Sequence, residues 1–350
     1  MIGSQTISDR VLLPATAERW AIAESARLER ALSILLEDAP AAVACRTRSA
    51  LETIFGWTLE SEWAEVMWSF SRLTGDGFPI EFTFSSTDEG ITYDGEVAGP
   101  EVPDGQRLLR AFDTLKRLGQ PQPPTEIVDL LTRIQASGAL SYGAWIGARH
   151  HVDGDRYKVY AEVPRSRWYK TRDEFGYLLG PEPLLNNCGI QLRLIGYDPH
   201  KRRTELYFRV EQLETLELAR LLNRAGLGGR LEELLTLLED CYGCSIGDTI
   251  PGANLGFSYS FGSDIKPIAF SLFAVARSLF GGDESIRKRL LALAMKRGWD
   301  VNTYEKLSAP IASRTGRRTR HCVLSFVVPP EGDLSIRVGM SPPDGARDLD

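Results

Sequence analysis

Five pairs of short alternating segments constrain the fold of this chain more than any other feature. In each segment apolar and polar residues alternate, and each pair is joined by a turn sequence and flanked by stretches with helical spacing. Asp153-Gly154 in the second pair is a strong hairpin dipeptide. The five pairs occupy residues 78–97, 142–163, 189–211, 254–274 and 320–340. Because they recur at intervals of about 60 residues, we expect one helix-and-hairpin unit used five times.

Amphipathic helical patterns lie between the hairpins. Leu28, Ala31, Leu32 and Leu35 form a single apolar stripe in the first of these patterns. The predicted helices cover residues 16–36, 42–55, 105–118, 125–137, 173–179, 213–223, 231–240 and 284–297. We expect their apolar faces to pack against the apolar faces of the hairpins.

The two faces of each hairpin differ in polarity. In the second hairpin Lys158 and Tyr160 alternate with Val159 and Ala161, as the two-residue period of a strand requires. An open sheet with one face in water satisfies this pattern. A closed barrel also satisfies it, removes exposed strand edges, and with ten strands leaves a lumen wide enough for ligands. We therefore expect an α+β fold whose ten antiparallel strands close into a barrel with a polar lumen and helices outside.

A length of 350 residues is compatible with one large domain. We expect the barrel at about residues 75–342. N-terminal helices at 15–70 would pack on it, and residues 343–350 would form a short C-terminal tail.

Charge and hydropathy exclude several classes of protein. The net charge of −6 provides no basic footprint for nucleic acid, and we interpret the arginine-rich stretch Arg314–Arg320 as a solvated loop. No apolar run reaches the roughly 18–20 residues that span a bilayer, and the first residues lack the pattern of a secretory signal. We expect a soluble cytoplasmic protein with no nucleic-acid or membrane partner.

The five cysteines do not predict a disulfide scaffold or a metal site. Cys241 and Cys244 form a lone C-x-x-C, which closes a predicted helix, whereas a redox motif of this type opens one. A structural zinc site would need two more ligands at a second paired spacing, and the sequence has none.

Three strand motifs carry a resemblance to a known family. They are Phe78-Pro-Ile-Glu81-Phe-Thr-Phe-Ser, Tyr157-Lys158-Val-Tyr160 and Asp198-Pro-His-Lys-Arg-Arg203-Thr-Glu205-Leu-Tyr207. They resemble the T-P-x-E-F-S, K-x-Y and D-P-x-x-x-R-x-K-x-Y strands of the ABBA-fold aromatic prenyltransferases, in the dimethylallyltryptophan-synthase-like branch. The resemblance covers roughly residues 70–340, in the same order along the chain.

The resemblance implies an enzyme that moves an isoprenyl group, dimethylallyl in the first instance, from an allylic diphosphate to an electron-rich aromatic acceptor. The acceptor would be an indole, a tryptophan or a tryptophan-containing compound. Glu81 would orient and deprotonate it. The implied diphosphate contacts are Lys158 and Arg203, with Arg209 and Arg337 as further cations, and the implied shields of the allylic cation are Tyr160 and Tyr207.

The residue types agree with this chemistry. Arg and Lys stabilise charge that develops on phosphate oxygens, and aromatic faces stabilise a nearby carbocation. Gln191, Arg193 and Glu205 are weaker candidates for acceptor contacts. No aspartate-rich metal motif is present, so no cofactor is required by the sequence, although Mg²⁺ is compatible with it.

Four positions depart from the family pattern. Glu205 stands where the family has Lys and Thr92 where it has Arg, while Ala269 and Arg337 stand where it has a shielding Tyr. Glu205 either neutralises Arg203 or binds a cationic acceptor, and the sequence leaves both roles open. The departures support an alternative, a non-catalytic barrel that binds a small molecule or peptide. A third hypothesis is an adaptor whose open polar sheet meets a protein partner.

Overall fold

The computed structural model describes residues 25–167, 171, 173–180, 189–263, 266–315 and 318–344. In this part of the chain, antiparallel strands form a closed barrel in which every strand pairs with its neighbours in sequence and β1 pairs with β10. The strands are β1 Ile80–Ser85, β2 Ile91–Glu96, β3 Ala144–His151, β4 Gly154–Glu162, β5 Gln191–Asp198, β6 Arg203–Val210, β7 Leu255–Phe261, β8 Pro267–Val275, β9 His321–Val328 and β10 Ser335–Met340. The predicted barrel is therefore confirmed, and the alternative of an open sheet is wrong.

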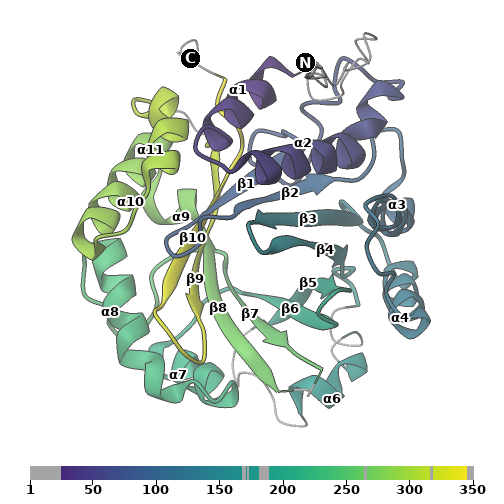
Figure 1. Ribbon diagram of the computed structural model, residues 1–350. Helices are drawn as coiled ribbons and strands as arrows, with labels where there is room; N and C mark the ends of the chain where they lie inside the picture. Colours follow the sequence, from purple (N-terminus) through teal and green to yellow (C-terminus); the bar gives the residue numbers. More distant parts are fainter. Residues whose placement is uncertain are drawn as a thin grey trace, which may run out of the picture.

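Helices surround the barrel, as Figure 1 shows. The α-helices are α1 Ala26–Leu35, α2 Ala41–Phe55, α3 Asp104–Arg117, α4 Thr125–Ala136, α6 Gly176–Leu179, α7 Thr215–Arg224, α8 Leu231–Tyr242, α9 Ala276–Phe280, α10 Asp283–Arg297 and α11 Asn302–Ser308. Short 3₁₀ turns are η2 Gly56–Leu59, η3 Gly228–Arg230 and η4 Ala309–Ile311. No helix in the described ranges is long and apolar enough to cross a membrane.

The hydrophobic core lies between the helices and the outer face of the barrel. Phe82, Val159 and Leu206 point outward from their strands and are almost fully buried. The residues that alternate with them point into the lumen, because successive side chains of a strand lie on opposite faces. The sequence-based separation into an apolar and a polar face is therefore the separation between the outside and the inside of the barrel.

The first helix is shorter than the pattern predicted. The apolar stripe indicated a helix over 16–36, whereas α1 begins after Ser25, whose side-chain oxygen accepts a hydrogen bond from the Leu28 N–H. A serine in this position satisfies a helix-start donor that has no partner within the helix. Residues 16–24 of the predicted helix lie outside the described residues.

All five hairpin turns lie at one end of the barrel, and the helical connections lie at the other, because every hairpin runs in the same sense. We call these the turn end and the helix end. Residues near the start of an odd-numbered strand, such as Glu81, lie toward the helix end. Residues near the start of an even-numbered strand, such as Arg203 and Arg337, lie toward the turn end.

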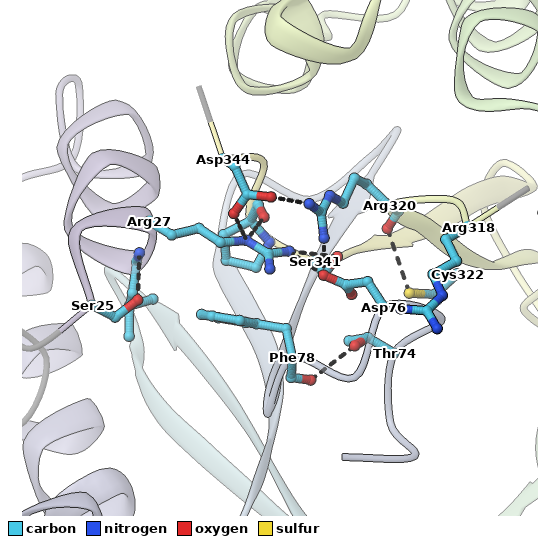
Figure 2. A network of polar contacts seen from close by, with 12 residues as sticks. Ser25, Arg27, Thr74, Asp76, Phe78, Arg318, Arg320, Cys322, Ser341 and Asp344 are labelled. Atoms are coloured by element: carbon cyan, nitrogen blue, oxygen red, sulfur yellow. Dashed lines mark hydrogen bonds and ion pairs between the residues drawn. The ribbon is translucent and has the colours of Figure 1, made fainter. Parts of the chain in front are cut away.

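An ion-pair network joins the first helix, the segment before β1 and the residues around β9 and β10 (Figure 2). Asp76 binds both Arg27, at 2.6 Å, and Arg320. Asp344 binds the same two arginines. The prediction of a solvated arginine loop is wrong for Arg320, which is buried because two carboxylates neutralise it. Asp344, within the predicted tail at 343–350, belongs to this network, and residues 345–350 lie outside the described residues.

A candidate active site in the barrel lumen

A carboxylate lies between two cations in the lumen. Glu205 on β6 lies 2.6 Å from Lys158 Nζ on β4 and 3.2 Å from Arg203 on its own strand. The Tyr207 hydroxyl donates a hydrogen bond to the same carboxylate. We call Lys158, Arg203, Glu205 and Tyr207 the Glu205 cluster. The motif residues predicted to act together on the donor are thus brought together, with Glu205 at their centre.

Charge controls the protonation state of the Glu205 cluster. Burial alone would raise the pKa of the Glu205 carboxyl, but Lys158 and Arg203 outweigh burial and lower it to about 2. Glu205 is therefore an anion at physiological pH. Burial and the adjacent Glu205 carboxylate raise the pKa of Tyr207 well above its ordinary value, so Tyr207 remains a neutral donor.

Aromatic rings form the wall beside this cluster. Tyr160 and Tyr207 meet edge to face with ring centroids 5.9 Å apart, and Lys158 Nζ lies 5.3 Å from the Tyr160 ring centroid. Phe273 on β8, which the motifs did not single out, lies 6.1 Å from Tyr207. Ala269 lies on the same face of β8 but supplies no ring. The family pattern has a tyrosine at the position of Ala269. Phe273, on the same strand, therefore supplies a ring to the aromatic wall that Ala269 does not.

Glu81 faces a second carboxyl group that the sequence analysis missed. Glu81 on β1 is the register partner of Asp94 on β2, and both point into the lumen. Burial, followed by the charge of Asp94, raises the pKa of Glu81 to about 8. Burial also raises the pKa of Asp94 to about 7, although Lys158 partly opposes it. Glu81 therefore holds its proton more tightly than an ordinary carboxyl group.

Glycines on neighbouring strands make room for these side chains. A Cβ at Gly147 would lie 2.6 Å from an Asp94 carboxylate oxygen and 2.9 Å from the Tyr160 ring. A Cβ at Gly196 would lie 3.0 Å from Lys158 Cδ. Any larger residue at either place would push a site side chain from its position.

Arg337 and Arg149 add cations toward the turn end. Arg337 on β10 is exposed to the lumen and forms no hydrogen bond or ion pair with another described residue, and its charge lowers the pKa of Asp94. Thr92 carries no charge, but its register partner on β3 is Arg149. Arg149 is held by Asp88 through two hydrogen bonds of 2.6 and 2.7 Å. The cation missing at 92 is thus present one strand away, although a carboxylate neutralises it.

Arg209, Gln191 and Arg193 lie apart from the Glu205 cluster. Arg209 is six residues beyond Arg203 on the same strand, about 20 Å along it at 3.3 Å per residue, toward the helix end. Its guanidinium binds Asn254, and Arg193 binds the Gln191 amide oxygen at 3.2 Å. The structure therefore does not place Arg209 with Lys158 and Arg203, and it places Arg209 beside Gln191 instead.

A surface cavity of about 610 Å³ lies at the turn end, around the β1–β2 turn and against α11. Of the positions discussed above, Thr92 lines it, while Lys158, Arg203 and Glu81 do not. The described residues contain no group of His, Cys, Asp and Glu side chains that could hold a metal ion. Cys241 is buried in α8, and this burial raises its pKa.

Comparison with known proteins gives a match in structure alone. No family model matches the sequence, and no curated protein matches it. The structure is similar to 6-dimethylallyltryptophan synthase from Micromonospora olivasterospora, solved with DMASPP and Trp, with a TM-score of 0.67 and 19% identity over 90% of this chain and 96% of that one. It is also similar to 5-dimethylallyltryptophan synthase from Streptomyces coelicolor, solved with the same ligands, with a TM-score of 0.70 and 17% identity over 91% and 94% of the two chains.

A third similar structure is the prenyltransferase PriB, solved with L-tryptophan and dimethylallyl thiolodiphosphate, with a TM-score of 0.66 and 18% identity over 89% of this chain and 94% of that one. About nine tenths of this chain is covered in each case. This chain therefore has the closed ABBA barrel fold of the dimethylallyltryptophan synthases.

Proposed function

We propose that this protein transfers a dimethylallyl group from an allylic diphosphate to an electron-rich aromatic acceptor of the indole class, with tryptophan as the first candidate. The observation that carries the proposal is the arrangement inside the lumen. The cations Lys158 and Arg203, the rings of Tyr160 and Tyr207 and the Glu81 carboxyl group all face the lumen. The similar structures that contain a dimethylallyl thiolodiphosphate and tryptophan support the assignment.

In the proposed reaction the diphosphate lies between Lys158 and Arg203 on one wall and Arg337 on another. The bond between the allylic carbon and the diphosphate oxygen breaks, and its electron pair goes to the diphosphate, where these cations stabilise the new charge. The protein's own cations supply this stabilisation, so the proposal needs no metal ion. Turnover measured with and without Mg²⁺ shows whether the ion contributes. Arg209 is not part of this group, because it lies toward the helix end.

The allylic cation would lie against the faces of Tyr160 and Tyr207, which attract positive charge and keep water away. A ring atom of the acceptor then forms a bond to the cation, and the acceptor loses a proton to the Glu81 carboxylate. Burial suits Glu81 to this step, because a pKa of about 8 makes its anion a stronger base than an ordinary carboxylate. Gln191 and Arg193 at the helix end remain candidates for the acceptor's own polar groups.

The test is turnover with dimethylallyl diphosphate and tryptophan, scored as release of diphosphate together with a prenylated product. Lys158→Ala should lose turnover while remaining folded. Lys288→Ala, which removes an exposed lysine of α10, is the matched control and should behave like the wild type. Wild-type turnover in Lys158→Ala would contradict the assignment of this lumen as the donor site.

A non-catalytic binding barrel remains the second candidate, and one observation favours it. Glu205 offsets one of the two positive charges of Lys158 and Arg203, and Asp88 offsets that of Arg149, so these carboxylates reduce the positive charge that could help to ionise a donor. Tight binding of a dimethylallyl diphosphate analogue without any release of diphosphate would support this candidate. We further propose that the chain acts as a single domain, since its described helices pack on one barrel. A cytoplasmic location is proposed from the sequence alone.

A further inference from the structure

We propose that Glu205 occupies the place of the donor's diphosphate at Lys158 and Arg203, and that the donor must displace this internal carboxylate in order to bind. The inference rests on the proposed function and goes beyond it. It assigns to one residue the control of donor affinity, and it answers the question whether Glu205 neutralises the cations or binds an acceptor.

The contacts of Glu205 are those that a bound phosphate group would make. One carboxylate oxygen lies 2.6 Å from Lys158 Nζ, and the other lies 3.2 Å from the Arg203 guanidinium. The Tyr207 hydroxyl supplies a third donor. Charge-assisted hydrogen bonds from Lys and Arg are the interactions by which proteins hold phosphate oxygens, so the carboxylate uses the same donors.

The cations can exchange partners because they are only partly enclosed. The side chains of Lys158 and Arg203 are 22% and 28% exposed, whereas that of Glu205 is 9% exposed. Arg203 Nε is buried without a hydrogen-bond partner among the described residues, which leaves one donor of the guanidinium for a ligand. The two cations can thus turn toward the lumen while Glu205 stays on the wall.

Glu205 keeps polar neighbours when the cations leave it. Tyr207 can continue to donate to its carboxylate, and the register partner of Glu205 on β7 is the buried Ser260. A carboxylate that loses two cations but retains hydrogen-bond partners is tolerable in the lumen. Displacement is therefore a cost to donor binding and does not prevent it.

The decisive variant is Glu205→Gln, which keeps the shape of the side chain and its ability to accept from Tyr207 but removes the charge. We expect inorganic diphosphate, titrated by calorimetry at pH 7, to bind this variant about tenfold or more tightly than the wild type. The KM for dimethylallyl diphosphate should fall in the same direction, because the donor uses the same cations.

Glu81→Gln is the matched control. It removes a second lumen carboxyl, but the pKa of Glu81 is about 8, so the net charge at pH 7 changes little and diphosphate affinity should stay within about twofold. In the Lys158→Ala background the effect of Glu205→Gln should shrink, since residues in one ion-pair network are not additive.

The outcomes separate the inference from the function. Equal or weaker diphosphate binding by Glu205→Gln than by a wild type that does bind would overturn the inference, because Glu205 would then position the cations and not compete with the donor. Absence of binding in all variants would overturn both the inference and the proposed function.

If Glu205→Gln does not fold, Glu205→Asp replaces it. Its shorter side chain withdraws the carboxylate from Lys158, so tighter binding supports the inference and unchanged binding overturns it.

Discussion

Two regions of the molecule use the same arrangement, a carboxylate held by two cations, in different surroundings. In the network of Figure 2, Asp76 binds Arg27 and Arg320 at the junction of the first helix and the last strands. In the lumen, Glu205 binds Lys158 and Arg203. Both carboxylates have a lowered pKa, because in each case the two cations outweigh the effect of burial.

The cations of the two regions differ in what else holds them. Arg27 also binds Ser341 and lies 4.1 Å from the Phe78 ring centroid, and Asp344 binds it together with Arg320. Arg320 is only 7% exposed. Lys158 and Arg203 are more exposed and face open lumen. An ion pair that is closed on all sides stabilises the fold, whereas one with an open side can bind a ligand.

The largest effect is expected when the closed network is broken. Asp76→Asn should lower the free energy of unfolding by about 3 kcal/mol at pH 7, because Arg27 and Arg320 lose the charge that compensates their burial. The pKa of Asp76 is lowered in the folded protein, so its stabilisation is complete above the unfolded pKa of about 4 and is lost as the pH falls below that value. Urea unfolding at pH 7 and at pH 3 measures both parts. A loss that is the same at the two pH values would show that the charge of Asp76 does not matter.

Glu81 should also make the free energy of unfolding depend on pH, but with the opposite sign to Asp76. Its pKa of about 8 is higher than in the unfolded chain, so the wild type should lose stability as the pH rises from about 5 to 9. Glu81→Gln should remove on the order of 2–4 kcal/mol of that loss. Thermal unfolding across this range provides the measurement. Parallel curves for the two proteins would mean that Glu81 titrates normally.

The same carboxyl should shape the pH profile of the reaction. Since Glu81 must be ionised to accept a proton, kcat/KM should rise with pH toward about 8 and then level off. A profile that is flat between pH 6 and 8.5 would exclude Glu81 as the base in the rate-limiting step.

Removing the charge of Glu205 should lower the free energy of unfolding much less than removing the charge of Asp76. Glu205→Gln should change the free energy of unfolding by about 1 kcal/mol or less, because water in the lumen can solvate the partly exposed Lys158 and Arg203. Urea unfolding beside Asp76→Asn makes the comparison direct. Equal losses in the two variants would remove the distinction between a closed and an open ion pair.

The smallest effect on turnover is expected when the Tyr207 hydroxyl is removed. Tyr207→Phe deletes one hydrogen bond to Glu205, worth about 1 kcal/mol, but keeps the ring that faces the proposed cation. Turnover should stay within about fivefold of wild type, whereas Tyr207→Ala should release more prenyl alcohol because water reaches the cation. Product analysis by chromatography distinguishes the two variants. Similar prenyl alcohol from both would place the role of Tyr207 in its hydroxyl and not in its ring.

Local patterns were enough to predict the barrel and its polar interior. Strand alternation identified Lys158, Tyr160, Glu205 and Tyr207 as inward-facing, and the five hairpins specified their order. Alternation assigned Arg209 and Arg203 to the same face but gave no position along the barrel axis, and the two residues lie six positions apart on β6.

The sequence patterns did not predict which side chains pair with one another. Asp94 became the partner of Glu81 through the register of β1 and β2. Arg320 appeared to lie in a solvated loop because its partner Asp76 is 244 residues away along the chain. The Glu81–Asp94 pairing lies within one hairpin and depends on its exact register, whereas the Arg320–Asp76 pairing has no local signal because it depends on how distant segments meet in the closed barrel.

The most direct test of the account is thermal unfolding in the presence of dimethylallyl S-thiolodiphosphate, an unreactive donor analogue, for the wild type, Lys158→Ala and Lys288→Ala. A ligand that binds only the native state adds about 2.7 kcal/mol at 100 times its Kd. The account predicts stabilisation of the wild type and of Lys288→Ala, and its loss in Lys158→Ala. No stabilisation of the wild type, or equal stabilisation of all three proteins, would contradict a donor site at Lys158 in the barrel lumen.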